Sequence, residues 1–223
     1  HAAGGFAWLP DSSGFYFATN AGRDFAALAR HDLASGRTEI VAEAPHDIQN
    51  VQLCGGGQYL LWTTNEDGVF RLHGRDLVRG ELLIPPSVPE GVFALSCPAG
   101  SEVAVIHVNG WATPGDVYAW DLVAGRATTV WASNLAGLDP AGLVRPLSLR
   151  TKARDGVELQ GLLYLPKAAR NGGDAPPVVF DVHGGPTLQA LADYRGYVQY
   201  LVNRGIAVFR PNVRGSRGFG HRY

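Results

Sequence analysis

Residues 53–63, LCGGGQYLLWT, set the pattern from which the fold can be predicted. The same order of a glycine turn followed by a β-rich run occurs at residues 9–19, LPDSSGFYFAT, and at residues 96–106, SCPAGSEVAVI. The three aligned glycines are spaced 43 residues apart, at Gly14, Gly57 and Gly100. A repeat of this length is typical of architectures in which one supersecondary unit stacks on the next.

Each unit also repeats an Asp-Leu pair before a second glycine turn, at Asp32, Asp76 and Asp121. The second unit divides into four short runs that favour strands, at residues 50–54, 59–64, 69–77 and 81–84. Four strands in about 43 residues predict the blade of a β-propeller. A flat β-sandwich is the alternative, but it gives no reason for three units in one register. We expect about three blades in residues 1–146, with further blades before His1.

The two cysteines, Cys54 and Cys97, lie at equivalent places in adjacent units. Because propeller blades fan apart, we expect their Cα atoms to be farther apart than the roughly 7 Å that a disulfide allows. The prediction is two free thiols. Two cysteines without a nearby histidine or second pair do not make a zinc site.

The repeat ends at residue 146, and residues 147–223 follow a different pattern. Residues 147–154 and 157–165 flank Asp155-Gly156 and predict an antiparallel hairpin. Residues 178–182, VVFDV, predict a strand covered on both faces. A helix with a stripe from Tyr194 to Val202 and a stop at Gly205, followed by a strand at residues 206–210, completes a βαβ unit. The predicted fold class is therefore all-β propeller blades followed by the first part of an α/β domain.

A glycine-rich loop follows the strand at residues 178–182 and consists of His183, Gly184, Gly185 and Pro186. Functional loops of α/β sheets lie at the carboxyl ends of strands. Glycines let backbone N–H groups approach a ligand closely, so this turn can present donors to the oxyanion of an acyl-transfer reaction. A phosphate cradle is the rival interpretation, but neither GxGxxG nor GxxxxGK[ST] is present.

These motifs, in this order, resemble the prolyl oligopeptidase family of serine peptidases, and most of all its acylaminoacyl-peptidase and dipeptidyl-aminopeptidase branches. The resemblance rests on RDG (154–156), LYLP (163–166), VHGGP (182–186) and NVRGSRGFG (212–220). Over residues 1–146 it rests on architecture alone. It implies an α/β-hydrolase domain capped by a propeller, a Ser-Asp-His triad, no cofactor and short peptides as substrates.

No G-x-S-x-G nucleophile elbow occurs in the chain. Ser216 is the nearest candidate, but the resemblance places it in the loop before the nucleophile strand. We expect the triad beyond Tyr223, no catalytic residue within the chain, and no hydrolase activity of the 223-residue segment alone. His183 is not expected to be the triad base, because that histidine normally comes last in chain order.

Arg214 and Gly215 belong to the second glycine-rich loop and are expected to support the site. A fixed cation at Arg214 can orient a carboxylate or tie the domain together, and we favour the structural role. The blade histidines are expected to be ordinary propeller residues rather than metal ligands, at His46, His73 and His107. His221 and Arg222 receive no assignment.

Composition sets the remaining limits. A net charge of -1 argues against nucleic acid or an anionic membrane as a partner. There is neither a signal peptide nor an apolar run of the roughly 20 residues that a membrane helix needs, so we expect a soluble protein, with the cytoplasm favoured over the periplasm or secretion. The absence of methionine suggests an interior piece of a longer polypeptide, whose remainder is then a partner.

Three functions remain open from the sequence. The first is a serine peptidase acting on short peptides. The others are a propeller-bearing binding or scaffold module with a vestigial hydrolase part, and an esterase on the same scaffold. A homo-oligomer is possible in each case.

Overall fold

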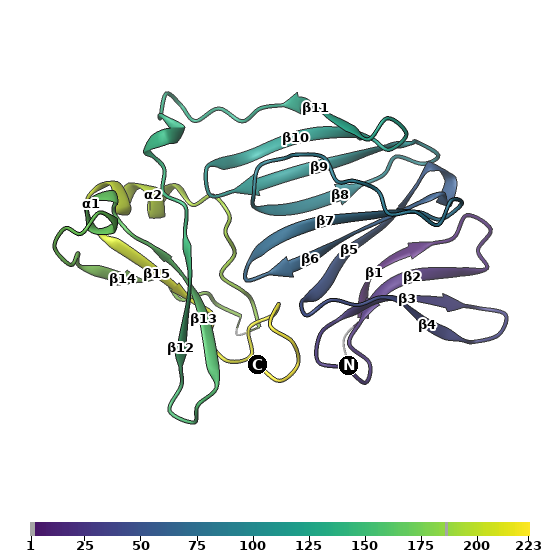
Figure 1. Cartoon of the computed structure of the whole chain (residues 1–223), viewed down its shortest axis with the longest axis horizontal. Helices are drawn as coiled ribbons and strands as arrows, with labels where there is room; N and C mark the ends of the chain where they lie inside the picture. Colours follow the sequence, from purple (N-terminus) through teal and green to yellow (C-terminus); the bar gives the residue numbers. More distant parts are fainter. Residues whose placement is uncertain (1–2, 186) are drawn as a thin grey trace.

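Four β-sheets follow one another along the chain in the structure, a computed structural model that describes residues 3–185 and 187–223 (Figure 1). The first sheet contains β1 (Ala3–Trp8), β2 (Gly14–Thr19), β3 (Ala27–Asp32) and β4 (Thr38–Ala42). The second contains β5 (Asp47–Cys54), β6 (Tyr59–Glu66) and β7 (Val69–Asp76). The third contains β8 (Val92–Ser96), β9 (Val103–Gly110), β10 (Thr113–Asp121) and β11 (Arg126–Trp131). Within each of these three sheets, consecutive strands pair antiparallel, as the repeat predicted.

The repeated aspartates have the same structural role in all three sheets. Each ends a strand, and its carboxylate accepts a backbone hydrogen bond from the turn that follows. Asp32 accepts from the N–H of Ser35 at 2.8 Å, and Asp76 accepts from the N–H of Val78 at 2.9 Å. Asp121 accepts in the same way. Aspartate is favoured in turns because its short side chain bonds to the backbone two or three residues on.

The second sheet lies between two apolar clusters. On β6, Tyr59 and Leu61 belong to a cluster shared with the third sheet, whereas Leu60 and Trp62 belong to one shared with the first. Successive side chains of a strand point to opposite faces, so one strand contributes to both cores. The blades are therefore held together by burial on either side of β6.

The second sheet lacks the fourth strand that the sequence predicted at residues 81–84. Only one isolated bridge forms there, between Arg75 and Leu82. Pro85 and Pro86 follow at once, and proline has no N–H to continue a ladder. Ile84 is accordingly 84% exposed.

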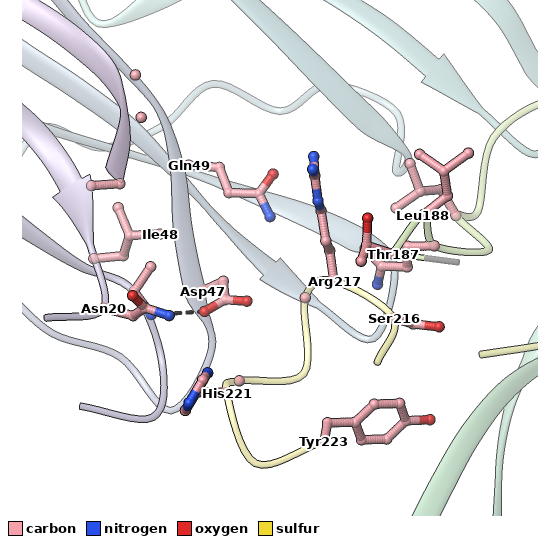
Figure 2. A pocket seen from close by; sticks show the side chains of 18 of the residues that line it. Asn20, Asp47, Ile48, Gln49, Thr187, Leu188, Ser216, Arg217, His221 and Tyr223 are labelled. Carbon is pink, nitrogen blue, oxygen red and sulfur yellow. Dashed lines mark hydrogen bonds between the residues drawn. The ribbon is translucent and has the colours of Figure 1, made fainter. Parts of the chain in front are cut away.

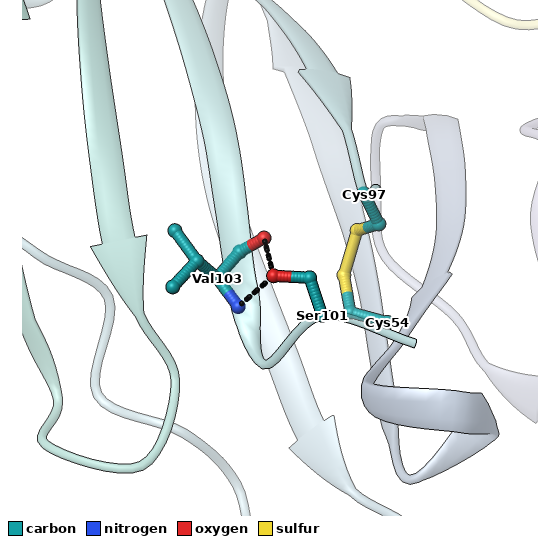
Figure 3. The surroundings of a disulfide bond; sticks show 4 residues. All are labelled: Cys54, Cys97, Ser101 and Val103. Carbon is teal, nitrogen blue, oxygen red and sulfur yellow. Dashed lines mark hydrogen bonds between the residues drawn. A yellow bond between two sulfur atoms is a disulfide. The ribbon is translucent and has the colours of Figure 1, made fainter. Parts of the chain in front are cut away.

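Cys54 and Cys97 form a disulfide with a Cα–Cα distance of 5.2 Å, so the prediction of free thiols was wrong (Figure 3). Cys54 ends β5 and Cys97 follows β8, which are the first strands of their sheets. These two strands contact each other. Blades diverge toward their outer strands but converge at their inner ones, and the cysteines lie where the blades converge.

The fourth sheet has the order β12-β13-β15-β14 and begins with the predicted hairpin of β12 (Leu147–Lys152) and β13 (Glu158–Tyr164). β14 (Val178–Phe180) pairs parallel with β15 (Ala207–Pro211), and α2 (Gly196–Asn203) connects them. This arrangement confirms the predicted βαβ unit. Gly205 has a φ of +82°, as expected for the glycine that ends a helix. Two short helical turns, η2 (Pro140–Gly142) and α1 (Lys167–Arg170), lie in the connections.

Within this chain, residues 178–182 are not covered on both faces, contrary to the expectation. All three residues of β14 are exposed, and Phe180 retains 67% of its accessible surface. The reason is position, because β14 is the outermost strand of its sheet.

Within the described ranges, no helix combines the length and the apolar character needed to cross a membrane.

Candidate functional site

A cavity of about 1010 Å³ lies between the blades and the loops that follow the strands of the fourth sheet (Figure 2). Asp47, Ile48 and Gln49 of β5 line it from the blade side. The opposite wall comes from two loops, residues 187–195 after β14 and residues 215–223 after β15. Because β14 and β15 are parallel, both loops leave from carboxyl ends of strands, which is where α/β sheets bind ligands.

The loop that the sequence singled out runs directly into this cavity wall. Gly184 and Gly185 are exposed, and Gly185 has a φ of +67°, a conformation that favours glycine. Within the described part of the chain, neither residue donates its backbone N–H to a hydrogen bond. Two free donors are thus available at the strand end. Pro186 lies outside the described residues.

His183 contacts Ser216, 33 residues away in the sequence. Its Nε2 lies 2.9 Å from the Ser216 Oγ, and that hydroxyl donates to the backbone carbonyl of Val213 at 2.6 Å. A hydroxyl has a single proton, so the Ser216 Oγ accepts from the N–H at Nε2. A general base would need the opposite polarity, in which the serine donates to the imidazole.

The His183–Ser216 contact therefore joins the two glycine-rich loops and does not activate a nucleophile. Ser216 is also only 3% exposed, so it offers no surface to a substrate carbonyl.

Arg214 lies apart from this contact. Its guanidinium bonds to Asp155, at 2.8 Å from Oδ2, and both side chains are about half exposed. The hydrogen bond from Arg214 lowers the pKa of the Asp155 carboxyl below its usual value. The pair ties the loop after β15 to the turn between β12 and β13. Gly215, the next residue, lines the cavity.

Arg210 is a buried cation that the sequence analysis did not single out. Its Nε lies 3.0 Å from the Asp181 Oδ2, and its Nη1 lies 3.0 Å from the Asp193 Oδ1. The same Nη1 donates to the backbone carbonyl of Leu191 at 2.8 Å. Asp181 follows β14 and Asp193 precedes α2, so one guanidinium holds both ends of the connection between these two elements. An arginine inside the otherwise apolar run IAVFRP is the sequence signal that could have revealed it.

Tyr197 of α2 adds to this network by donating its hydroxyl to the Asp181 Oδ2 at 2.6 Å. Burial, together with this bond to a carboxylate, raises the pKa of the Tyr197 phenol. These polar contacts hold the two ends of the segment that carries the loop.

No cluster of three or more His, Cys, Asp or Glu side chains that could hold a metal ion occurs in the described residues. Of the blade histidines, His73 stacks on Trp62 with its ring centroid 5.6 Å away, and its Nε2 lies 2.9 Å from the hydroxyl of Thr64.

Comparison with known proteins shows which proteins this chain resembles. Dipeptidyl aminopeptidase BIII of Pseudoxanthomonas mexicana is 32% identical over 228 residues, covering 94% of this chain and 32% of that protein. The crystal structure of a puromycin hydrolase matches all of this chain and 35% of its own, with a TM-score of 0.83 and 27% identity. Prolyl oligopeptidase B from Galerina marginata shares the fold, with a TM-score of 0.80 at 17% identity over 94% of this chain and 30% of its own. The resemblance to the prolyl oligopeptidase family is confirmed. No protein-family model matches the chain.

The chain spans about a third of the length of these prolyl oligopeptidase relatives. The predicted fold class is confirmed as well, because the chain has propeller blades followed by a sheet with a βαβ unit, and its fold matches that of the solved relatives. The named relatives are peptidases or hydrolases.

In this chain, polar contacts fix the blades to the α/β sheet. Asp67, in the turn after β6, accepts from the Arg150 guanidinium at 2.7 Å and from the Ser148 hydroxyl at 2.9 Å. Asn65 donates to the side chain of Gln189 at 2.7 Å. The turn and the site loop thus meet directly, and the two walls of the cavity are held in register. The sequence could not reveal these pairs, because they join residues more than 80 positions apart.

Proposed function

We propose that the chain is part of a serine peptidase that hydrolyses short peptides by acyl transfer, and that the loop at His183, Gly184, Gly185 and Pro186 forms the oxyanion side of its site. The observation that carries the proposal is the pair of free backbone N–H groups at Gly184 and Gly185, at the carboxyl end of β14 and beside the cavity. Backbone donors held in advance are what a developing oxyanion requires. The peptidase relatives support the reaction class.

Ser216 is not the nucleophile in this proposal. Its proton is engaged with the Val213 carbonyl, and its hydroxyl accepts from His183. The nucleophile and its triad partners would come from the longer protein, beyond Tyr223. In the acyl-transfer step, the nucleophilic serine attacks the substrate carbonyl, whose oxygen becomes negative and accepts hydrogen bonds from the loop. The amine then leaves with a proton from the triad histidine, and water releases the acyl group.

The test replaces Gly185 with Val in the full-length protein and compares it with His183→Ala. Valine is disfavoured at a φ of +67°, and its Cβ would lie 3.3 Å from the Leu188 side chain, so the turn must change shape. His183→Ala leaves the backbone donors in place. We expect kcat for one peptide anilide to fall about 10² to 10³-fold in Gly185→Val, with little change in KM, and less in His183→Ala.

Equal and small losses in the two variants would show that the loop is scaffold. Circular dichroism of both proteins controls for folding. A second experiment treats the 223-residue chain with a serine-phosphonylating probe, and we expect no adduct. Stoichiometric labelling at Ser216 would contradict the proposal.

A further inference from the structure

Arg217 is a cation on the cavity wall without a partner of its own. It is exposed, and within the described residues it forms neither an ion pair nor a side-chain hydrogen bond. Figure 2 shows its side chain extending from the loop after β15 into the space that Gln49 faces from the blade side. The guanidinium is therefore available to a molecule in the cavity.

The backbone on either side of Arg217 is fixed. Ser216 is buried and bonded to His183 and to the Val213 carbonyl. Gly218 has a φ of +89°, and a Cβ there would lie 2.5 Å from the Asn65 Nδ2. A side chain displayed from such a backbone loses less freedom on binding a ligand than one on a mobile loop.

The other charged groups of the cavity wall are already occupied. Arg195 pairs with Asp193 at 2.7 Å. One carboxylate oxygen of Asp47 accepts the backbone N–H of Ala26 at 2.7 Å. Arg217 is thus the cation of the described cavity wall that lacks a carboxylate.

We propose that Arg217 forms a carboxylate subsite, which binds the C-terminal carboxylate or an Asp or Glu side chain of a peptide substrate. This proposal rests on the proposed function, because it names the substrate class of the same site. Arginine suits the role, since its planar guanidinium donates two parallel hydrogen bonds to a carboxylate.

The test uses four peptides in two matched pairs with the full-length protein. One pair differs only in a free C-terminal carboxylate or its carboxamide, and the other, amidated at the C-terminus, differs only in Glu or Gln. We expect the wild-type protein to favour one carboxylate peptide about tenfold in kcat/KM, as one partly screened charge-assisted pair would give. Arg217→Gln should remove that preference and leave the neutral peptides within about twofold of wild type. The pair that responds identifies the source of the carboxylate.

Arg222→Gln is the matched control, because it removes the same charge from an exposed residue of the same loop that does not line the cavity. The preference should persist in it, and in part in Arg217→Lys. An equal loss for all four peptides in Arg217→Gln, or no preference in the wild type, would overturn the subsite. If the wild type hydrolyses no peptide, the proposed function fails. The Kd values of the same four peptides then test the subsite separately: tighter binding of a carboxylate peptide by the wild type, lost in Arg217→Gln, supports it, and equal binding overturns it.

Discussion

β6 begins with four apolar residues and β14 consists of three, yet their surroundings are opposite. Seven of the eight residues of β6 are buried, whereas all three of β14 are exposed. β6 is the middle strand of a sheet that lies between two others, and β14 is an outermost strand. The apolar character of a strand thus predicts that other elements can cover it. The position of the strand in the sheet decides whether they do. Within this chain, the middle blade is covered on both faces, whereas β14 leaves apolar side chains exposed at the edge of its sheet.

The largest effect is expected from shortening a buried side chain of the middle blade. Leu61 is fully buried, so Leu61→Ala should lower the free energy of unfolding by about 4 kcal/mol through lost burial and the cavity left behind. Val179 of β14 is 40% exposed, and Val179→Ala should lower it by less than about 1 kcal/mol. Urea denaturation of both variants measures the difference. Similar losses would erase the contrast between the two strands.

Replacing Arg210 tests whether its polar contacts stabilise the α/β region, where β14 leaves apolar side chains exposed. Arg210→Met leaves Asp181 and Asp193 without their shared cation, and we expect a loss of about 3 kcal/mol in unfolding free energy. The control is Arg214→Met, which breaks an exposed pair and should cost less than about 1 kcal/mol. If the two variants unfold at the same urea concentration, Arg210 does not organise this region.

Removing the disulfide tests how much the cross-link between two blades contributes to stability. Replacing both Cys54 and Cys97 with Ala should lower the free energy of unfolding by about 2 to 4 kcal/mol, because the cross-link closes a loop of 43 residues in the unfolded chain. Titration of the unfolded, unreduced protein should find no reactive thiol. Two reactive thiols would contradict the bond.

The smallest effect concerns pH. Burial lowers the pKa of His73, on β7, below its usual 6.5. As the pH falls through about 6.5, the unfolded state binds a proton before the folded state does, so stability is lost on acidification and is unaffected above that range. Melting temperatures at about pH 7.5 and about pH 5.5 should therefore differ less in His73→Gln than in wild type. An equal difference in both proteins would show that His73 does not contribute.

The parts of the fold that the sequence predicted correctly are those set by neighbours along the chain. The turn aspartates act on N–H groups two or three residues away, as at Asp76, and Gly205 ends its helix through its own φ. Hairpins and repeats follow from such short-range chemistry, so the blades and the βαβ unit could be predicted.

The features that the sequence did not predict depend on residues that are distant along the chain and come together in the fold. Cys54 and Cys97 were aligned correctly in the repeat, but their distance depends on how closely the inner strands approach. The contact between His183 and Ser216 and the double pairing of Arg210 join loops of different strands. At the candidate site, the sequence therefore predicted which loops lie beside the cavity. It did not predict which side chains hold those loops in place.

The double pairing of Arg210 has a consequence for how this protein could be re-engineered. Asp181 and Asp193 are both held by one side chain of β15. The ends of the segment between them should therefore stay in place when its length changes. Doubling the length of a flexible loop costs only about 0.6 kcal/mol in closure entropy. Insertions before Leu188, in the exposed part of this segment, should therefore cost little folding stability, whereas Gln189, Ala190 and Ala192 are bonded to other parts of the chain and should not tolerate them.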